Sequence, residues 1–126
     1  MSARVVHFEV PFDDAERALG FYREVFDWQI QPMPEMEYNI VATGPAGDDG
    51  MPNEPGYIGG GMMQRLEHVA TPVITLDVGD IDATLAEIEA HGGSTVEPKS
   101  AVGDMGFAAY FKDSEGNLMG LWQMAG

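Results

Sequence analysis

The sequence predicts an α+β fold built from two βαβββ modules in tandem. A strand, a helix and three further strands follow one another over about residues 1–64, and the same order recurs over about residues 72–126. The stretches GYIGGGMMQ and GNLMGLWQM, which end the two halves, carry glycines at matching places. Because 126 residues is the usual length of one domain, we expect a single domain that contains both modules.

The stretch VVHFEV opens the first module as a strand. Side chains alternate between the two faces of a strand, so Val6, Phe8 and Val10 are expected on a core face. His7 and Glu9 then lie side by side on the other face. We consider them as a metal site, as an acid–base pair or as a hydrogen-bonded polar pair.

A helix is expected over about residues 14–27. Asp13, followed three residues later by Glu16, forms a start that resembles a capping box. Apolar residues recur at helical spacing and predict one buried stripe that packs against the first strand. The members of this stripe are Ala18, Phe21, Tyr22, Val25 and Phe26.

Three short strands complete the first module, and we expect them at residues 28–31, 38–42 and 57–63. Prolines separate the first two, and a loop at residues 43–56 that is rich in helix and strand breakers precedes the third. Three consecutive glycines in the third strand predict that another backbone passes close to it.

The second module begins with a strand at residues 73–78 and a helix that Asp80 caps and Gly92 stops. Three strands follow, and the turn DSEGN joins the last two as a hairpin. These strands are expected near residues 95–98, 106–112 and 118–124. When the two halves are aligned, Met63 falls on Gln123 in the last strands, and His7 falls on Thr75 in the first strands.

The net charge of the chain limits the classes of molecule that it can bind. It has 21 acidic and 6 basic residues, a net charge of −15, which repels nucleic-acid phosphates and anionic membranes, so we expect neither partner. The acids indicate either a solvated surface or an attraction for cationic ligands.

There is no cysteine, which excludes disulfides and thiolate ligands. No stretch has the pattern of a signal peptide or a membrane span, so we expect a cytoplasmic protein.

The segments HFEVPFDDAERALGFYREVFDW and KDSEGNLMGLWQ, in this order of elements, resemble the vicinal oxygen chelate superfamily of glyoxalases, bleomycin-resistance proteins and extradiol dioxygenases. The resemblance covers essentially the whole chain. It implies one glyoxalase/bleomycin-resistance-like domain over residues 1–126, with two modules whose curled mixed sheets form a cleft. It also implies a homodimer, as relatives often are. The superfamily hosts several chemistries, so the fold does not determine the activity.

In metal-using members of this superfamily, the ligands come from the first and last strands of each module. The resemblance carries these positions to His7, Met63, Thr75 and Gln123. His7 is a strong donor and Gln123 a weak one, whereas a thioether and a hydroxyl are poor donors for a divalent ion. We therefore expect no cofactor and keep only His7 and Gln123 as weak metal candidates. Shifting the alignment by two residues would offer the carboxylates of the two first strands instead.

Three interpretations of function remain open, and whether the protein is an enzyme is left open with them. We favour a metal-independent small-molecule-binding protein, whose ligand is apolar or aromatic, with a cationic group as one option. The alternatives are a metal-dependent glyoxalase-like lyase or isomerase and a structural module with a vestigial cleft. The candidate ligand-binding residues are His7, Glu9, Trp28, Met63, Thr75, Asp77, Tyr110, Trp122 and Gln123. Tyr38, Tyr57, Met62 and Phe107 are weaker candidates, for which we expect places in the core.

Overall fold

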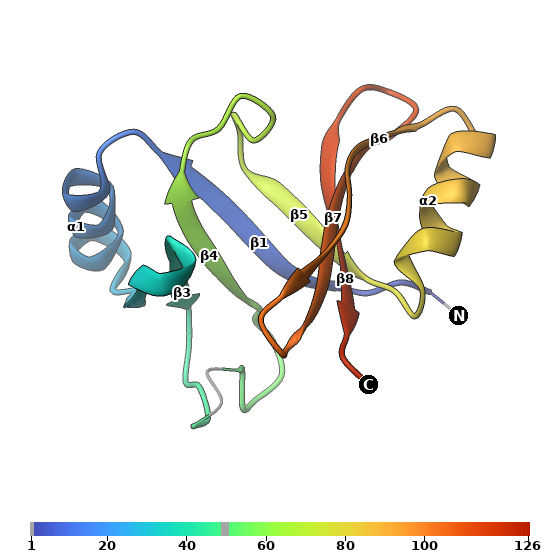
Figure 1. Cartoon of the computed structure of the whole chain (residues 1–126). Helices are drawn as coiled ribbons and strands as arrows, with labels where there is room; N and C mark the ends of the chain where they lie inside the picture. The colour runs from blue at the N-terminus through green and yellow to red at the C-terminus, as the bar shows by residue number, and fades with distance from the viewer. Residues whose placement is uncertain (1, 49–50) are drawn as a thin grey trace. The chain divides into compact units, whose positions relative to one another are not determined.

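The computed structural model describes residues 2–48 and 51–126. These residues form two compact units. The first unit is His7–Pro72, and the second unit combines residues 2–6 with Val73–Gly126. The helix and the strands follow the order β-α-β-β-β twice along the chain (Figure 1), so the predicted α+β class with two βαβββ modules is confirmed.

The first unit holds one helix against a four-stranded sheet. The sheet order is β2-β3-β4-β1, in which β1 and β4 are parallel and the other neighbours are antiparallel. The elements are β1 (Val5–Phe12), α1 (Ala15–Phe26), β2 (Gln29–Met33), the 3₁₀ helix η1 (Pro34–Met36), β3 (Tyr38–Ala42) and β4 (Gly59–Gln64).

Helix α1 begins one residue later than the capping pattern suggests. Asp14 is the N-cap residue, and its carboxylate accepts a hydrogen bond from the backbone N–H of Arg17 at 3.0 Å. Asp13 forms an ion pair with Arg65 instead, with 2.9 Å between Nε and Oδ1. At the other end, Asp27 adopts the left-handed conformation (φ 59°), and its N–H bonds to the carbonyl of Arg23.

The buried side of α1 differs from the predicted stripe. Leu19 is the buried residue of the helix, and Tyr22 packs beside it against the core. These two residues are three apart and share the face that meets the sheet, whereas Phe21 and Val25 point to the flank. Phe26 lies at the last helical position. The exposed fractions of Phe21, Val25 and Phe26 are 53%, 58% and 57%, so the prediction that they are buried is wrong.

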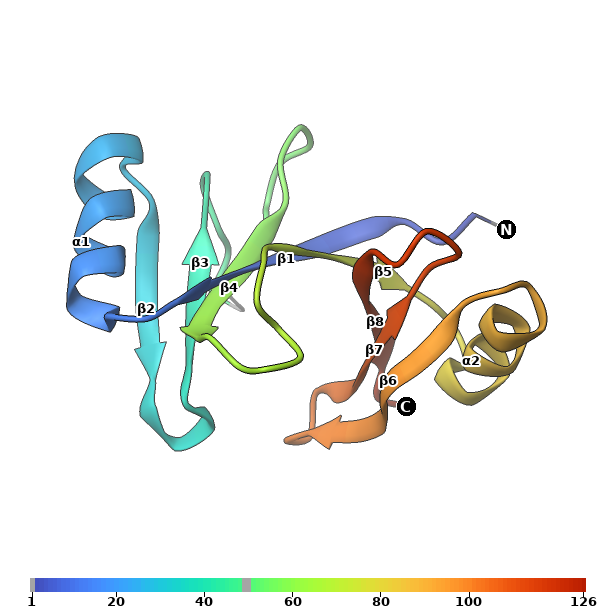
Figure 2. The same cartoon turned by 90° about the horizontal axis from the view of Figure 1, so that it is seen from above.

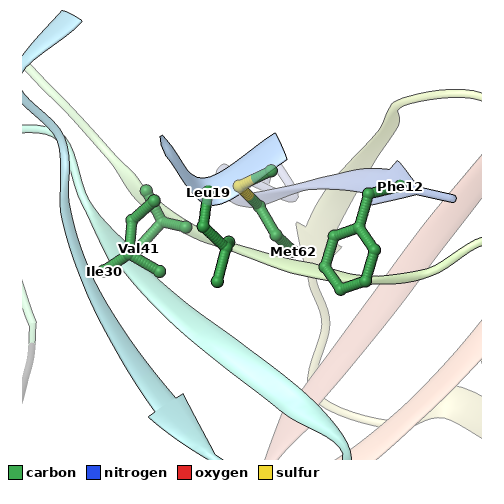
Figure 3. Packing of buried hydrophobic residues seen from close by; sticks show 5 residues of the cluster. All are labelled: Phe12, Leu19, Ile30, Val41 and Met62. Atoms are coloured by element: carbon green, nitrogen blue, oxygen red, sulfur yellow. The ribbon is translucent and has the colours of Figure 1, made fainter. Parts of the chain in front are cut away.

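The core of the first unit lies between α1 and one face of the sheet. Its five buried side chains, which Figure 3 shows gathered together, are Phe12, Leu19, Ile30, Val41 and Met62. Phe8 and Val10 pack against this cluster, which confirms the core face predicted for these two residues of β1. Because side chains alternate along the strand, His7 and Glu9 lie on the opposite face, which carries no helix of this unit.

The glycines of β4 allow the close approach that the sequence predicted. Gly60 is the Cα partner of Phe8 in β1. A Cβ atom added at Gly60 would lie 2.6 Å from the carbonyl oxygen of Phe8, and one added at Gly59 would lie 3.2 Å from that of Val41. Real Cβ atoms essentially never come within 3.0 Å of another heavy atom, so Gly60 permits the pairing with β1.

The second unit repeats this plan. Its sheet order is β5-β8-β7-β6, with β5 and β8 parallel and the other neighbours antiparallel. The elements are β5 (Val73–Asp77), α2 (Ile81–Ala90), β6 (Ser94–Val102), β7 (Gly106–Lys112) and β8 (Leu118–Met124). In Figure 2, α2 lies beside these strands, and the buried residues between them are Ile81, Leu85, Ala109, Phe111 and Leu121.

Local signals in the second unit are confirmed. Asp80 caps α2 by accepting from the N–H of Ala83 at 3.0 Å, and Gly92 follows the helix with a φ of 98°. The N–H of Asp113 bonds to the carbonyl of Asn117 at 3.0 Å and closes the predicted hairpin. Strand β6 is longer than expected and contains register irregularities. Within residues 2–48 and 51–126, no helix combines the length and the apolar composition that a membrane crossing demands.

The pairing of the strands corrects the alignment of the two halves. Glu9 is the Cα partner of Gly61 in the first unit, and Thr75 is the Cα partner of Gly120 in the second. Glu9 and Thr75 are also the buried polar residues of their strands, and each precedes the N-cap of its helix by the same distance. Thr75 therefore corresponds to Glu9, and its alignment with His7 is wrong.

Candidate functional site

Three side chains form a hydrogen-bonded chain on the helix-free face of the first unit, which we call the His7–Tyr38–Glu9 network. His7 and Glu9 come from β1, and Tyr38 comes from β3. The hydroxyl of Tyr38 donates to Oε2 of Glu9 at 2.8 Å, and its oxygen lies 2.8 Å from Nε2 of His7. The tyrosine therefore joins the two polar residues that the first strand places side by side.

Tyr38 can take this position because Gly61 has no side chain. A Cβ atom at Gly61 would lie 1.9 Å from the Tyr38 hydroxyl oxygen and 2.0 Å from Cζ of the ring. The rings of Tyr38 and His7 are nearly parallel, with 18° between their planes and 6.3 Å between their centroids. The third glycine of the GGG stretch thus accommodates an aromatic ring rather than a backbone.

Burial affects the protonation of His7. Burial lowers the pKa of His7, and the negative charge of Glu9 raises it by a smaller amount, so the pKa lies below its ordinary value of 6.5. The imidazole is therefore neutral at neutral pH. Glu9 is only 8% exposed, and the hydrogen bond from Tyr38 satisfies one of its oxygens. A neutral base and a carboxylate with a shared hydroxyl can both bind and orient polar groups of a ligand.

The lowered pKa of His7 predicts a pH dependence of stability. The unfolded chain takes up a proton on His7 near pH 6.5, whereas the folded chain resists it. The stabilisation is fully present above pH 6.5 and is lost as the pH falls from there through the lowered folded pKa. Denaturant unfolding of the parent and His7→Gln at several pH values checks this. We expect the variant to have the smaller loss between pH 7 and 5, and parallel curves would contradict it.

Tyr38 is the site residue that sequence analysis placed in the core. The alternation within YNIVA could have revealed its position. Val41 of this strand is buried in the core, and Tyr38 is three residues away, so its side chain points to the opposite face of the sheet. The sequence alone did not indicate which strand pairs with β4, so it did not reveal that this face meets Glu9. The structure supplies that order, since β3 and β1 both pair with β4.

Trp28 lies on the other side of the same sheet, away from the network. Its ring stacks on Tyr22 at 4.5 Å between centroids and 12° between planes, and it also contacts Phe8 at 5.5 Å. It therefore packs against the core of the first unit. Met63 of β4 is 7% exposed and lies two residues from Gly61, on the face of the network.

Most site candidates of the second unit lie on the face of its sheet that is opposite α2. Leu76, Ala109 and Leu121 contact α2 or its cluster, so their neighbours in the strands point the other way. A Cβ atom at Gly120 would lie 2.7 Å from Oγ1 of Thr75, which shows how closely this pair packs. The candidates on this face are Thr75, Asp77, Tyr110 and Trp122.

Gln123 points toward α2 instead. Its side-chain oxygen accepts a hydrogen bond from the backbone N–H of Ile81 at 2.8 Å, at the first residue of the helix. Gln64 ends β4 in the same way and donates to the carbonyl of Asp13, just before α1. Both last strands thus carry the pattern G-x-x-Q, and Gln64 rather than Met63 is the counterpart of Gln123. Each glutamine ties a last strand to the start of a helix.

The donor set does not fit a divalent metal. Of the four positions inherited from the family pattern, His7 shares Nε2 with Tyr38, and Gln123 has its oxygen on Ile81. Met63 and Thr75 are buried and offer a thioether and a hydroxyl. Within residues 2–48 and 51–126, no three His, Asp or Glu side chains come together as a metal ion would require.

Sequence comparisons show which known proteins this chain with its repeated βαβββ unit resembles. The family described as bleomycin resistance protein-like N-terminal matches residues 4–44, which run from β1 through β3. A glyoxylase-like domain-containing protein from Didymella fabae is 25% identical over 122 residues, which cover 93% of this chain and 91% of that protein.

Solved structures share the fold. A methylmalonyl-CoA epimerase from Mycobacterium tuberculosis has a TM-score of 0.62 at 16% identity, covering 97% of this chain and 88% of that one. One from Streptomyces coelicolor, in complex with 2-nitronate-propionyl-CoA, has a TM-score of 0.63 at 18% identity and full coverage of both chains. A glyoxalase/bleomycin resistance protein/dioxygenase superfamily member from Vibrio splendidus 12B01 has a TM-score of 0.60 at 15% identity, covering 98% and 99%. These structures show that the chain shares their fold, and the sequence matches and the fold are together similar to those of the vicinal oxygen chelate superfamily.

Proposed function

We propose that this protein binds a small molecule on the helix-free face of the first unit and does so without a metal. The observation that carries the proposal is the His7–Tyr38–Glu9 network, because three polar side chains held together over a glycine form an ordered anchor for a ligand. Met63 supplies an adaptable apolar neighbour on the same face. A structural neighbour is in complex with a CoA derivative, which supports a small-molecule partner but says nothing about its charge.

A ligand screen by thermal unfolding tests this proposal. A library of small apolar and aromatic compounds, with and without cationic groups, is added to the parent, His7→Ala and Tyr57→Phe. A ligand at 100 times its dissociation constant adds about 2.7 kcal/mol to the folded state and raises the Tm. We expect such compounds for the parent and for Tyr57→Phe, and a lost response in His7→Ala. Tyr57 is the matched control, since its buried hydroxyl has no hydrogen-bond partner among residues 2–48 and 51–126.

Two outcomes of this screen would favour the alternatives. If no compound raises the Tm of the parent, the interpretation as a structural module gains support. If His7→Ala keeps the full response, the ligand binds away from the network.

Metal analysis separates the proposal from the metal-dependent lyase or isomerase. We expect the protein, purified without a polyhistidine tag, to carry well under one equivalent of zinc, nickel, iron or manganese. About one metal per chain in the parent, lost in His7→Ala, would make the lyase or isomerase the better interpretation.

A further inference from the structure

We infer that Tyr38 and Glu9 set the tautomer of His7, so that the ligand of this site is a neutral or cationic molecule that donates a hydrogen bond to Nδ1 of His7. This inference rests on the proposed function, because it names the chemistry of the same site. It assigns Tyr38 and Glu9 as positioning residues that act through His7.

The tautomer follows from counting protons along the network. A carboxylate only accepts hydrogen bonds, so the single hydroxyl proton of Tyr38 points to Oε2 of Glu9. The Tyr38 oxygen then has only lone pairs to offer to His7, and the 2.8 Å contact requires a proton on Nε2. A neutral imidazole has one N–H proton, so Nδ1 of His7 carries a lone pair.

We infer that the lone pair on Nδ1 of His7 accepts its hydrogen bond from a ligand. Among residues 2–48 and 51–126, the ring of His7 forms its hydrogen bond to Tyr38 through Nε2, and no hydrogen bond to Nδ1 is seen. Burial keeps the ring neutral by lowering its pKa, so Nδ1 stays an acceptor at neutral pH. A ligand that offers an N–H or O–H group would complete the network.

The charges around the network favour a ligand without negative charge. Glu9 is a buried acid beside His7, and the whole chain carries a net charge of −15. Two arginines of the first unit are engaged elsewhere, because Arg23 donates to the carbonyl of Ile30 and Arg65 pairs with Asp13. An anion bound to the neutral His7 would lie beside the negative charge of Glu9, which would repel it.

Nuclear magnetic resonance of the imidazoles tests the tautomer. The chain has three histidines, so their ring nitrogens are readily assigned. In the parent at neutral pH we expect His7 to show only the Nε2–H tautomer, with an observable hydrogen-bonded Hε2 proton. Tyr38→Phe should lose this proton signal and populate the second tautomer, whereas Tyr57→Phe should match the parent. A proton on Nδ1 of the parent, or no change in Tyr38→Phe, would overturn the inference.

Four probes that share one ring test the ligand class: benzyl alcohol, benzylamine, anisole and benzoate. Benzyl alcohol and benzylamine should shift the Nδ1 resonance of His7. Anisole lacks the donor and should bind up to about tenfold more weakly, the value of one hydrogen bond, and benzoate should bind more weakly still. Equal or tighter binding of anisole or benzoate at this face would overturn the ligand class while leaving the proposed function intact. Binding of none of the four would count against the proposed function itself, whatever the tautomer.

Discussion

Replacing Gly61 by alanine is expected to break the His7–Tyr38–Glu9 network. The new Cβ atom would lie 1.9 Å from the Tyr38 hydroxyl oxygen, so the tyrosine must move. The obstacle is the far end of a side chain rather than a backbone, and β4 should therefore keep its pairing while Tyr38 swings away. Glu9 and His7 then lose the hydroxyl between them, which costs about 1–3 kcal/mol for a buried polar group without its partner.

Denaturant unfolding and the His7 resonances measure this effect together. Gly79→Ala is the matched control, because a Cβ atom at Gly79 meets nothing within 4 Å and its backbone is not left-handed. We expect Gly61→Ala to lower the free energy of unfolding, to lose the Hε2 signal and to lose any ligand response, with the control close to the parent. A Gly61→Ala protein with parental stability and an intact Hε2 signal would show that the network does not depend on this glycine.

Replacing Leu19 by alanine is expected to destabilise the fold far more than replacing the larger Phe21. Leu19 is buried in the core with Ile30, Val41 and Met62, so its truncation leaves a cavity and should cost about 2–5 kcal/mol. Phe21 is 53% exposed, with ring contacts to Tyr22 and Phe26, so its truncation should cost about 1 kcal/mol or less.

The two variants serve as controls for each other in denaturant unfolding. A larger loss for Phe21→Ala than for Leu19→Ala would mean that the predicted stripe, and not the observed face, is buried.

The sequence by itself determined the fold class and the order of the helices and strands along the chain. Alternation of apolar residues, the cap at Asp80, the stop at Gly92 and the hairpin turn are local signals, because each depends on residues a few positions apart. The structure confirms each of them. The polar face of β1 with His7 and Glu9 was predictable for the same reason, since it follows from alternation along one strand.

Only the tertiary structure decided which distant residues share a face. Tyr38 reaches Glu9 and His7 across 29 and 31 positions of sequence, through the pairing of both strands with β4. Gln123 looked like a ligand-binding residue, yet its side chain ties β8 to the start of α2.

The burial of α1 also depends on tertiary structure. Helical spacing indicates which residues form an apolar side, but it does not indicate which of them the sheet covers. Leu19 is covered, and Phe21 and Val25 are not. A shift of one residue in strand pairing reverses every side chain between the faces. The pairing of strands depends on packing between segments far apart in the chain, so local sequence patterns do not predict it.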